Sequence, residues 1–168
     1  MKKTAIIYSF NTNKTAKIAE KIREAFGDEP VEMINAEELN KEKFSSAENL
    51  ILGVPTWFDG ELPNYWDEFL PDLEDMDLTG KKIAIYGLGD QVKYSENFVD
   101  GIGIMASVLK DLNAELVGFT STEGYKFESS AALDGDKFQG LAIDYENQGS
   151  KNKERVKAWV EQLRKEFS

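Results

Sequence analysis

The sequence alternates short, largely apolar runs with longer stretches in which apolar residues recur three or four positions apart. The short runs predict strands at residues 4–8, 31–34, 49–54, 82–88 and 114–119, with a further run at 141–143. The longer stretches predict helices at residues 15–26, 35–46, 63–73, 97–112 and 153–167. Strands that are apolar on both faces need cover on both sides, which is typical of a parallel sheet. The pattern therefore predicts an α/β fold, a doubly wound parallel sheet with helices on both faces.

Residues 120–139 break this alternation. They are rich in Gly, Ser and Asp, show no clear periodicity, and separate the predicted strand at 114–119 from the apolar run at 141–143. We therefore expect an insertion that interrupts the fifth strand. We find no repeat, linker or low-complexity tract, and the 168 residues suit one domain, so we expect a single domain over residues 1–168.

Composition removes several classes of function. The chain has no Cys and no His, which excludes disulfides, zinc–thiolate and iron–sulfur sites, and a Ser-His-Asp triad. Its 31 acidic residues outnumber 20 basic ones, for a formal net charge of -11, and this argues against nucleic acid as a partner. The apolar runs are too short for a membrane span or a signal peptide, so we expect a soluble, cytoplasmic protein.

The acidic excess is concentrated in one segment. Residues 44–80 contain no Lys or Arg, and their acidic residues are Glu48, Asp59, Glu61, Asp67, Glu68, Asp72, Glu74, Asp75 and Asp77. Such a surface favours a basic protein partner or a cationic ligand. The alternative is that the acidic charge serves only to keep the protein in solution.

Ligands of doubly wound sheets bind beyond the carboxyl ends of the strands, which directs attention to three loops. The loop after the first strand comprises Ser9, Phe10, Asn11, Thr12, Asn13, Lys14 and Thr15. Hydroxyl, amide and ammonium donors at a helix N-terminus suit a phosphate group, although the glycine patterns of nucleotide-binding loops are absent. The alternative is an ordinary helix cap at Thr12 or Asn13.

The loops after the third and fourth strands carry aromatic residues and glycines. The third-strand loop holds Trp57 and Gly60, and the fourth-strand loop holds Gly89 and Tyr94. Two aromatic faces, with glycines that let backbone approach closely, suit a flat ligand. The three loops together predict a site for a planar, phosphorylated molecule.

At these loops the sequence resembles the long-chain flavodoxins over essentially its whole length. The resemblance rests on Pro55-Thr56-Trp57 with Gly60-Glu61-Leu62, on Gly89-Asp90-Gln91 through Tyr94 and Asn97-Phe98, on Gly101-Ile102-Gly103-Ile104, and on Gly124-Tyr125-Lys126-Phe127, Gly140 to Asp144 and Asn147-Gln148. It implies a five-stranded sheet in the order 2-1-3-4-5 and non-covalently bound flavin mononucleotide (FMN). It also implies a low-potential one-electron carrier that shuttles electrons between redox enzymes and is not itself a stand-alone catalyst.

The resemblance also implies roles for individual residues. Ser9, Phe10, Asn11, Thr12, Asn13, Lys14 and Thr15 would hold the FMN phosphate. Trp57 and Tyr94 would enclose the flavin ring, with Tyr94 the closer stack. The loop backbone would bond the ring edge through Pro55, Thr56, Phe58, Asp59, Gly60, Leu88, Gly89 and Asp90. Asn97 would lie near the pyrimidine end and Asp144 near the ribityl chain, and no residue is expected to bind metal.

The chain departs from the family's pattern at three positions. Phe10 stands where a Ser or Thr is usual, which removes one phosphate hydroxyl; Asn13 stands where Gly is usual, and Leu88 where Thr is frequent. The partners that the resemblance implies are basic-surfaced redox proteins, such as ferredoxin-NADP reductase, pyruvate oxidoreductase or nitrogenase, and the expected state is a monomer.

Three other interpretations stay open at this point. One is a flavodoxin-like quinone or azo reductase that takes hydride from a nicotinamide cofactor. Another is a response-regulator receiver domain, but the carboxylates that it needs are replaced by Ser9-Phe10 and Thr56. The last is a structural module without flavin.

Overall fold

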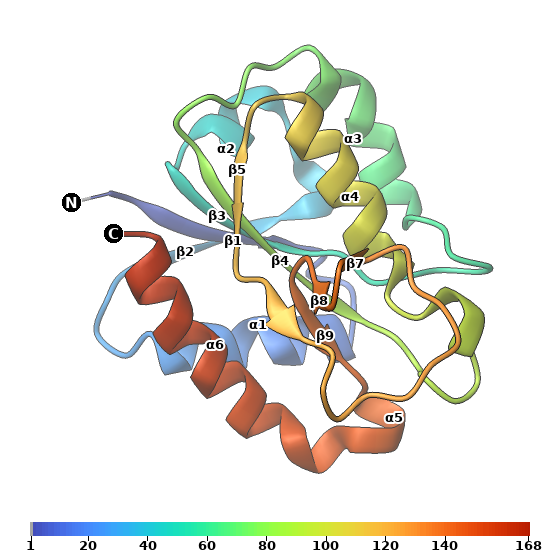
Figure 1. The fold of residues 1–168 in the computed structure, drawn as a ribbon. Coiled ribbons are helices and arrows are strands. Elements are labelled where there is room, and N and C mark those ends of the chain that lie inside the picture. The colour runs from blue at the N-terminus through green and yellow to red at the C-terminus, as the bar shows by residue number, and fades with distance from the viewer. Residues whose placement is uncertain (1) are drawn as a thin grey trace.

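The protein, described here over residues 2–168 from a computed structural model, is built on one central parallel sheet (Figure 1). The strands of this sheet are β1 (Thr4–Tyr8), β2 (Val31–Asn35), β3 (Asn49–Gly53), β4 (Lys82–Leu88), β5 (Glu115–Val117) and β9 (Leu141–Ile143). The order is β2-β1-β3-β4-β5, with β9 also paired to β4, and every pairing is parallel. This confirms the predicted fold class and strand order.

The fifth position of the sheet is shared by two strands. β5 pairs with the first half of β4, where Lys82 faces Glu115, and β9 pairs with the second half, where Tyr86 faces Leu141. Between them the chain leaves the sheet and forms three short strands: β6 (Thr120–Ser121), β7 (Leu133–Asp134) and β8 (Lys137–Phe138). These form a separate antiparallel sheet in the order β6-β8-β7. The fifth strand is therefore interrupted by an insertion, as the polar segment predicts.

Helices cover both faces of the sheet, as Figure 1 shows. Their bounds are α1 (Lys14–Ala25), α2 (Lys41–Ser45), α3 (Asn64–Glu74), α4 (Asp100–Asp111), α5 (Tyr145–Gln148) and α6 (Asn152–Glu166). Ile6 of β1 packs in a core with α1 and α6, whereas its neighbour Ile7 packs in a second core with α2, α3 and α4. Alternate strand residues thus supply two cores, which is why these strands are apolar on both faces.

Two predicted helices are wrong in extent, for identifiable reasons. Residues 35–46 form a 3-10 turn, η1 (Ala36–Glu38), and then α2, because two Asn side chains each start a turn of their own. Asn35 accepts a hydrogen bond from the Glu37 amide and Asn40 accepts one from the Lys43 amide, at 3.2 and 2.8 Å. The helix predicted from residue 97 begins at Asp100, because Val99 has a left-handed backbone with φ of 48°.

The sequence pattern also missed two short elements after β9. They are α5 and a following 3-10 turn, η3 (Gly149–Lys151), and both lack the length that produces a recognisable apolar period. A third 3-10 turn, η2 (Ser95–Asn97), precedes α4. Within residues 2–168, no helix combines the length and the apolar character needed to cross a membrane.

Candidate functional site

The loops that follow β3 and β4 meet at the carboxyl edge of the sheet and enclose a hollow of about 290 Å³. They meet because these strands are parallel neighbours, with Gly53 facing Tyr86 near the strand ends. The residues that line the hollow are Thr56, Trp57, Phe58, Gly89, Asp90, Tyr94 and Asn97. All seven belong to the residues singled out from the sequence, which the fold therefore brings together.

Three aromatic side chains at the hollow differ in exposure. Trp57 is half-buried and stands edge-on to Tyr65 and Phe58, at centroid distances of 5.9 and 6.3 Å. Tyr94 and Phe58 are 49% and 72% exposed, which is unusual for large aromatic rings. Exposed rings around a hollow leave apolar faces available to a flat ligand.

Residues 57–61 form a tight loop whose ends are tied together. The Trp57 amide donates to the Glu61 carbonyl at 2.8 Å, and the Glu61 amide donates to the Trp57 carbonyl at 2.7 Å. Phe58 and Gly60 both have positive φ, of 52° and 86°, and for Phe58 this backbone is strained. A Cβ on residue 60 would also lie 2.6 Å from Asp100 Oδ2, so glycine is required there by backbone and space.

The fourth-strand loop is held from behind by a buried carboxylate. Asp144 is fully buried and accepts hydrogen bonds from the Gln91 amide, the Gln91 side chain and the Asn147 amide, at 3.1, 2.7 and 3.0 Å. Gln91 Oε1 also accepts from the Lys126 amide in the insertion, at 2.6 Å. Asp144 therefore does not line the hollow; it fixes the loop that carries Tyr94, together with Gln91 and Asn147, which the sequence analysis did not assign to the site.

Asp90, by contrast, lies in the wall of the hollow. Its Oδ1 accepts from the Lys93 amide at 2.8 Å and from the Asn147 side chain at 2.7 Å. Partial burial would raise the pKa of Asp90, but these hydrogen bonds outweigh it and hold the pKa below its ordinary value. The carboxylate thus stays ionised, and negatively charged, at neutral pH.

The loop after β1 lies outside the lining of the hollow, at the start of α1. Its polar groups are Ser9 and Thr15, which are buried, and Asn11, Thr12, Asn13 and Lys14. Thr12 Oγ1 donates to the Ser9 carbonyl at 2.8 Å, whereas Asn13 precedes the helix without a side-chain capping bond. The expected phosphate donors are therefore present at the N-terminus of α1. Their loop follows β1, which is the neighbour of β3 in the sheet.

Residues from distant segments contact this first loop. Asn35 Oδ1 accepts from the Phe10 amide at 3.2 Å, Glu37 accepts from the Asn11 side chain, and Glu146 pairs with Lys14. They lie 25 or more positions away along the chain, so no local sequence signal identifies them. Of the remaining predicted residues, Pro55, Asp59 and Gly60 belong to the loop after β3, and Leu88 is the last residue of β4; none of them lines the hollow.

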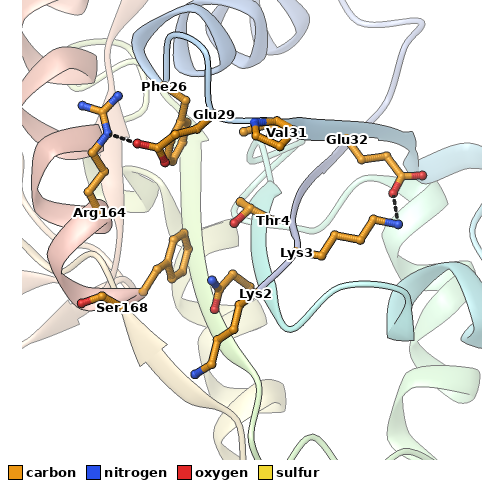
Figure 2. A pocket seen from close by; sticks show the side chains of 12 residues that line it. Lys2, Lys3, Thr4, Phe26, Glu29, Val31, Glu32, Arg164 and Ser168 are labelled. Carbon is orange, nitrogen blue, oxygen red and sulfur yellow. Dashed lines mark hydrogen bonds and ion pairs between the residues drawn. The ribbon is translucent and has the colours of Figure 1, made fainter.

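A larger hollow of about 900 Å³ lies at the opposite edge of the sheet, where β1, β2 and β3 begin (Figure 2). Its rim carries two ion pairs, Arg164 with Glu29 at 2.8 Å and Lys3 with Glu32 at 2.7 Å, as Figure 2 shows. These two pairs compensate four of the charges at the rim; Lys2 also lines the hollow. Because ligands of doubly wound sheets bind at the carboxyl ends of the strands, we assign the candidate site to the smaller hollow.

Comparisons with known proteins agree with this site and fold. The flavodoxin family model matches residues 6–159. The flavodoxin of Nostoc sp. is 40% identical over 166 residues, covering 99% of this chain and 98% of the relative. Flavodoxin 1 of Escherichia coli is 38% identical over 165 residues, covering 98% of this chain and 94% of the relative.

Solved structures show the same likeness. The crystal structure of the Fusobacterium nucleatum flavodoxin bound to flavin mononucleotide superimposes with a TM-score of 0.95 at 35% identity, covering 100% of both chains. A variant of that protein, also bound to flavin mononucleotide, gives the same TM-score and identity. The chain therefore belongs to the flavodoxin family of FMN-containing electron-transfer proteins.

Proposed function

We propose that this protein holds one FMN at the carboxyl edge of its sheet and acts as a low-potential one-electron carrier. When bound, FMN supplies redox chemistry in two one-electron steps, while the protein binds the cofactor and tunes its potentials. The observation that carries the proposal is the aromatic-lined hollow next to a donor-rich helix N-terminus, because FMN combines a flat ring with a phosphate.

The residues present fit FMN by the chemistry of their donor groups. We propose that residues 9–15 bind the phosphate, and that Trp57 and Tyr94 cover the ring. The backbone of residues 55–60 and 88–90, with Asn97, would bond the polar edge of the ring. Asp144 would act through the loop that it fixes.

The protein surface beside this site is negative and largely uncompensated. All nine acidic residues of segment 44–80 are exposed, but only some belong to the elements beside the site: Asp59 and Glu61 lie in the 57–61 loop and Asp67 and Glu68 in the first half of α3, whereas Glu48 precedes β3 at the opposite edge of the sheet. In the described chain the only one of the nine that pairs with a base is Asp75, with Lys41 at 3.5 Å. Negative charge near the ring disfavours the arrival of further negative charge during reduction. One carboxylate about 10 Å away, at an effective dielectric constant of about 40, contributes roughly 0.8 kcal/mol, or about 35 mV for one electron. Several such groups together support a low second potential.

We expect Asp59→Asn to raise the second one-electron reduction potential by about 35 mV, because it removes one exposed carboxylate from the 57–61 loop. A spectroscopic redox titration of the FMN-loaded protein measures this shift. Asp111→Asn is the matched control, since Asp111 is an exposed carboxylate at the far end of α4. An unchanged or lowered potential for Asp59→Asn would show that the local charge does not tune the site.

We further propose partners with basic surfaces, among them ferredoxin-NADP reductase, pyruvate oxidoreductase and nitrogenase. The exposed acids of segment 44–80 support this choice, because opposite charges steer redox proteins together. We also propose a cytoplasmic, single-domain monomer. Only a few large apolar side chains are exposed in the described chain, and their small number supports the monomer. They are Phe10, Phe58, Val92, Tyr94 and Leu133.

A further inference from the structure

Two of the donors proposed to bind phosphate are already engaged by carboxylates. The Asn11 side-chain amide donates to Glu37, and Lys14 forms an ion pair with Glu146. Both pairs are accessible to solvent, since the Lys14 and Glu146 side chains are 42% and 52% exposed and Glu37 is also exposed. Two negative groups therefore occupy the first loop where a phosphate is expected.

The fold itself brings Glu37 to this loop. Glu37 lies in η1, the turn that directly follows β2, and Asn35 Oδ1 accepts from both the Glu37 amide and the Phe10 amide, each at 3.2 Å. One side chain thus ties the start of the turn to the loop. Glu37 is held beside Asn11 by this backbone arrangement and not only by its own flexible side chain.

Glu146 is positioned in a similar way from the other side of the loop. It lies in α5, whose first turn is capped by the buried Asp144 through the Asn147 amide at 3.0 Å. Its neighbour Tyr145 also contacts the base, with Lys14 Nζ 5.8 Å from the ring centroid. Lys14 is thereby drawn towards α5, where Glu146 neutralises its charge.

We propose that Glu37 and Glu146 compete with the phosphate of the ligand for Asn11 and Lys14, and so set the preference for a phosphorylated over an unphosphorylated flavin. This inference rests on the proposed function. A phosphate needs the same donors, and each carboxylate also repels it. Exposed ion pairs are weak, so displacing the two carboxylates lowers affinity by a moderate factor and does not prevent binding.

The test compares FMN with riboflavin, which lacks the phosphate, in titrations of the full-length apoprotein followed by flavin fluorescence. Glu37→Gln and Glu146→Gln keep an acceptor but lose the charge. We expect each to raise FMN affinity about threefold and the double variant about tenfold, the range typical of exposed charge pairs. Riboflavin affinity should stay unchanged. Glu115→Gln, an exposed Glu at the start of β5, is the matched control and should alter neither affinity.

A second arm separates competition for Lys14 from general repulsion. In a Lys14→Met background, Glu146→Gln should improve FMN binding far less, because the contested base is gone. An equal improvement in that background would overturn the proposed competition. So would an unchanged or reduced FMN-to-riboflavin affinity ratio for both single variants, which would mean that the carboxylates orient the donors for phosphate. An unmutated apoprotein that binds neither flavin would instead reject the proposed function.

Discussion

Tyr94→Ala is expected to weaken FMN binding by about 10- to 100-fold, and Trp57→Ala by a similar factor, since stacking on one aromatic side chain contributes roughly 1–3 kcal/mol. Both side chains line the hollow, and Tyr94 is already 49% exposed, so its removal disturbs the protein itself little. Trp57 also packs edge-on against Tyr65, so Trp57→Phe is the milder variant that retains a ring.

Titration of each apoprotein with FMN measures this effect. Val92→Ala is a suitable control, because Val92 lies in the same loop as Tyr94 and is 72% exposed but does not line the hollow. The control should bind FMN normally. If the FMN dissociation constants stayed unaltered in both alanine variants, the flavin ring could not be enclosed between Trp57 and Tyr94.

Asp144→Ala is expected to lower the free energy of unfolding by roughly 3 kcal/mol, because the loss leaves several buried donors unpaired. Those donors are the Gln91 amide, the Gln91 side chain and the Asn147 amide. FMN affinity should fall as well, since Gln91 belongs to the loop that carries Tyr94. Asp144→Asn, which retains one acceptor oxygen, should lose less stability than Asp144→Ala.

Urea unfolding followed by circular dichroism measures the stability loss. Asp134→Ala provides the control, because Asp134 is an exposed carboxylate in β7 of the insertion. We expect its unfolding midpoint to stay close to that of the unmutated protein. If Asp144→Ala were as stable as this control, the buried carboxylate would not be the support of the fourth-strand loop.

The strands and the place of the site follow from local sequence because both depend on simple periods. Predicted strands 4–8 and 82–88 coincide with β1 and β4. A short, uninterrupted apolar run needs burial on both faces, and a strand inside a parallel sheet provides it. The sheet then fixes which loops are neighbours. This is why the sequence alone predicts that Trp57 and Tyr94, 37 positions apart, lie close together.

Other features depend on contacts between distant segments and have no local signal. The start of α4 at Asp100 depends on the left-handed backbone of Val99, which its β-branched side chain would not suggest. The carboxylates at the first loop, Glu37 and Glu146, look like ordinary surface acids in the sequence. Only the paths of β2 and α5 bring them to Asn11 and Lys14.

We conclude that this chain is an FMN-dependent one-electron carrier of low potential. The most direct test is to expose the purified protein to FMN and to record visible absorption spectra while the protein is reduced stepwise. We expect one bound flavin per chain and two separated one-electron steps, the second at strongly negative potential. Failure to take up FMN, or a single two-electron step, would contradict this conclusion.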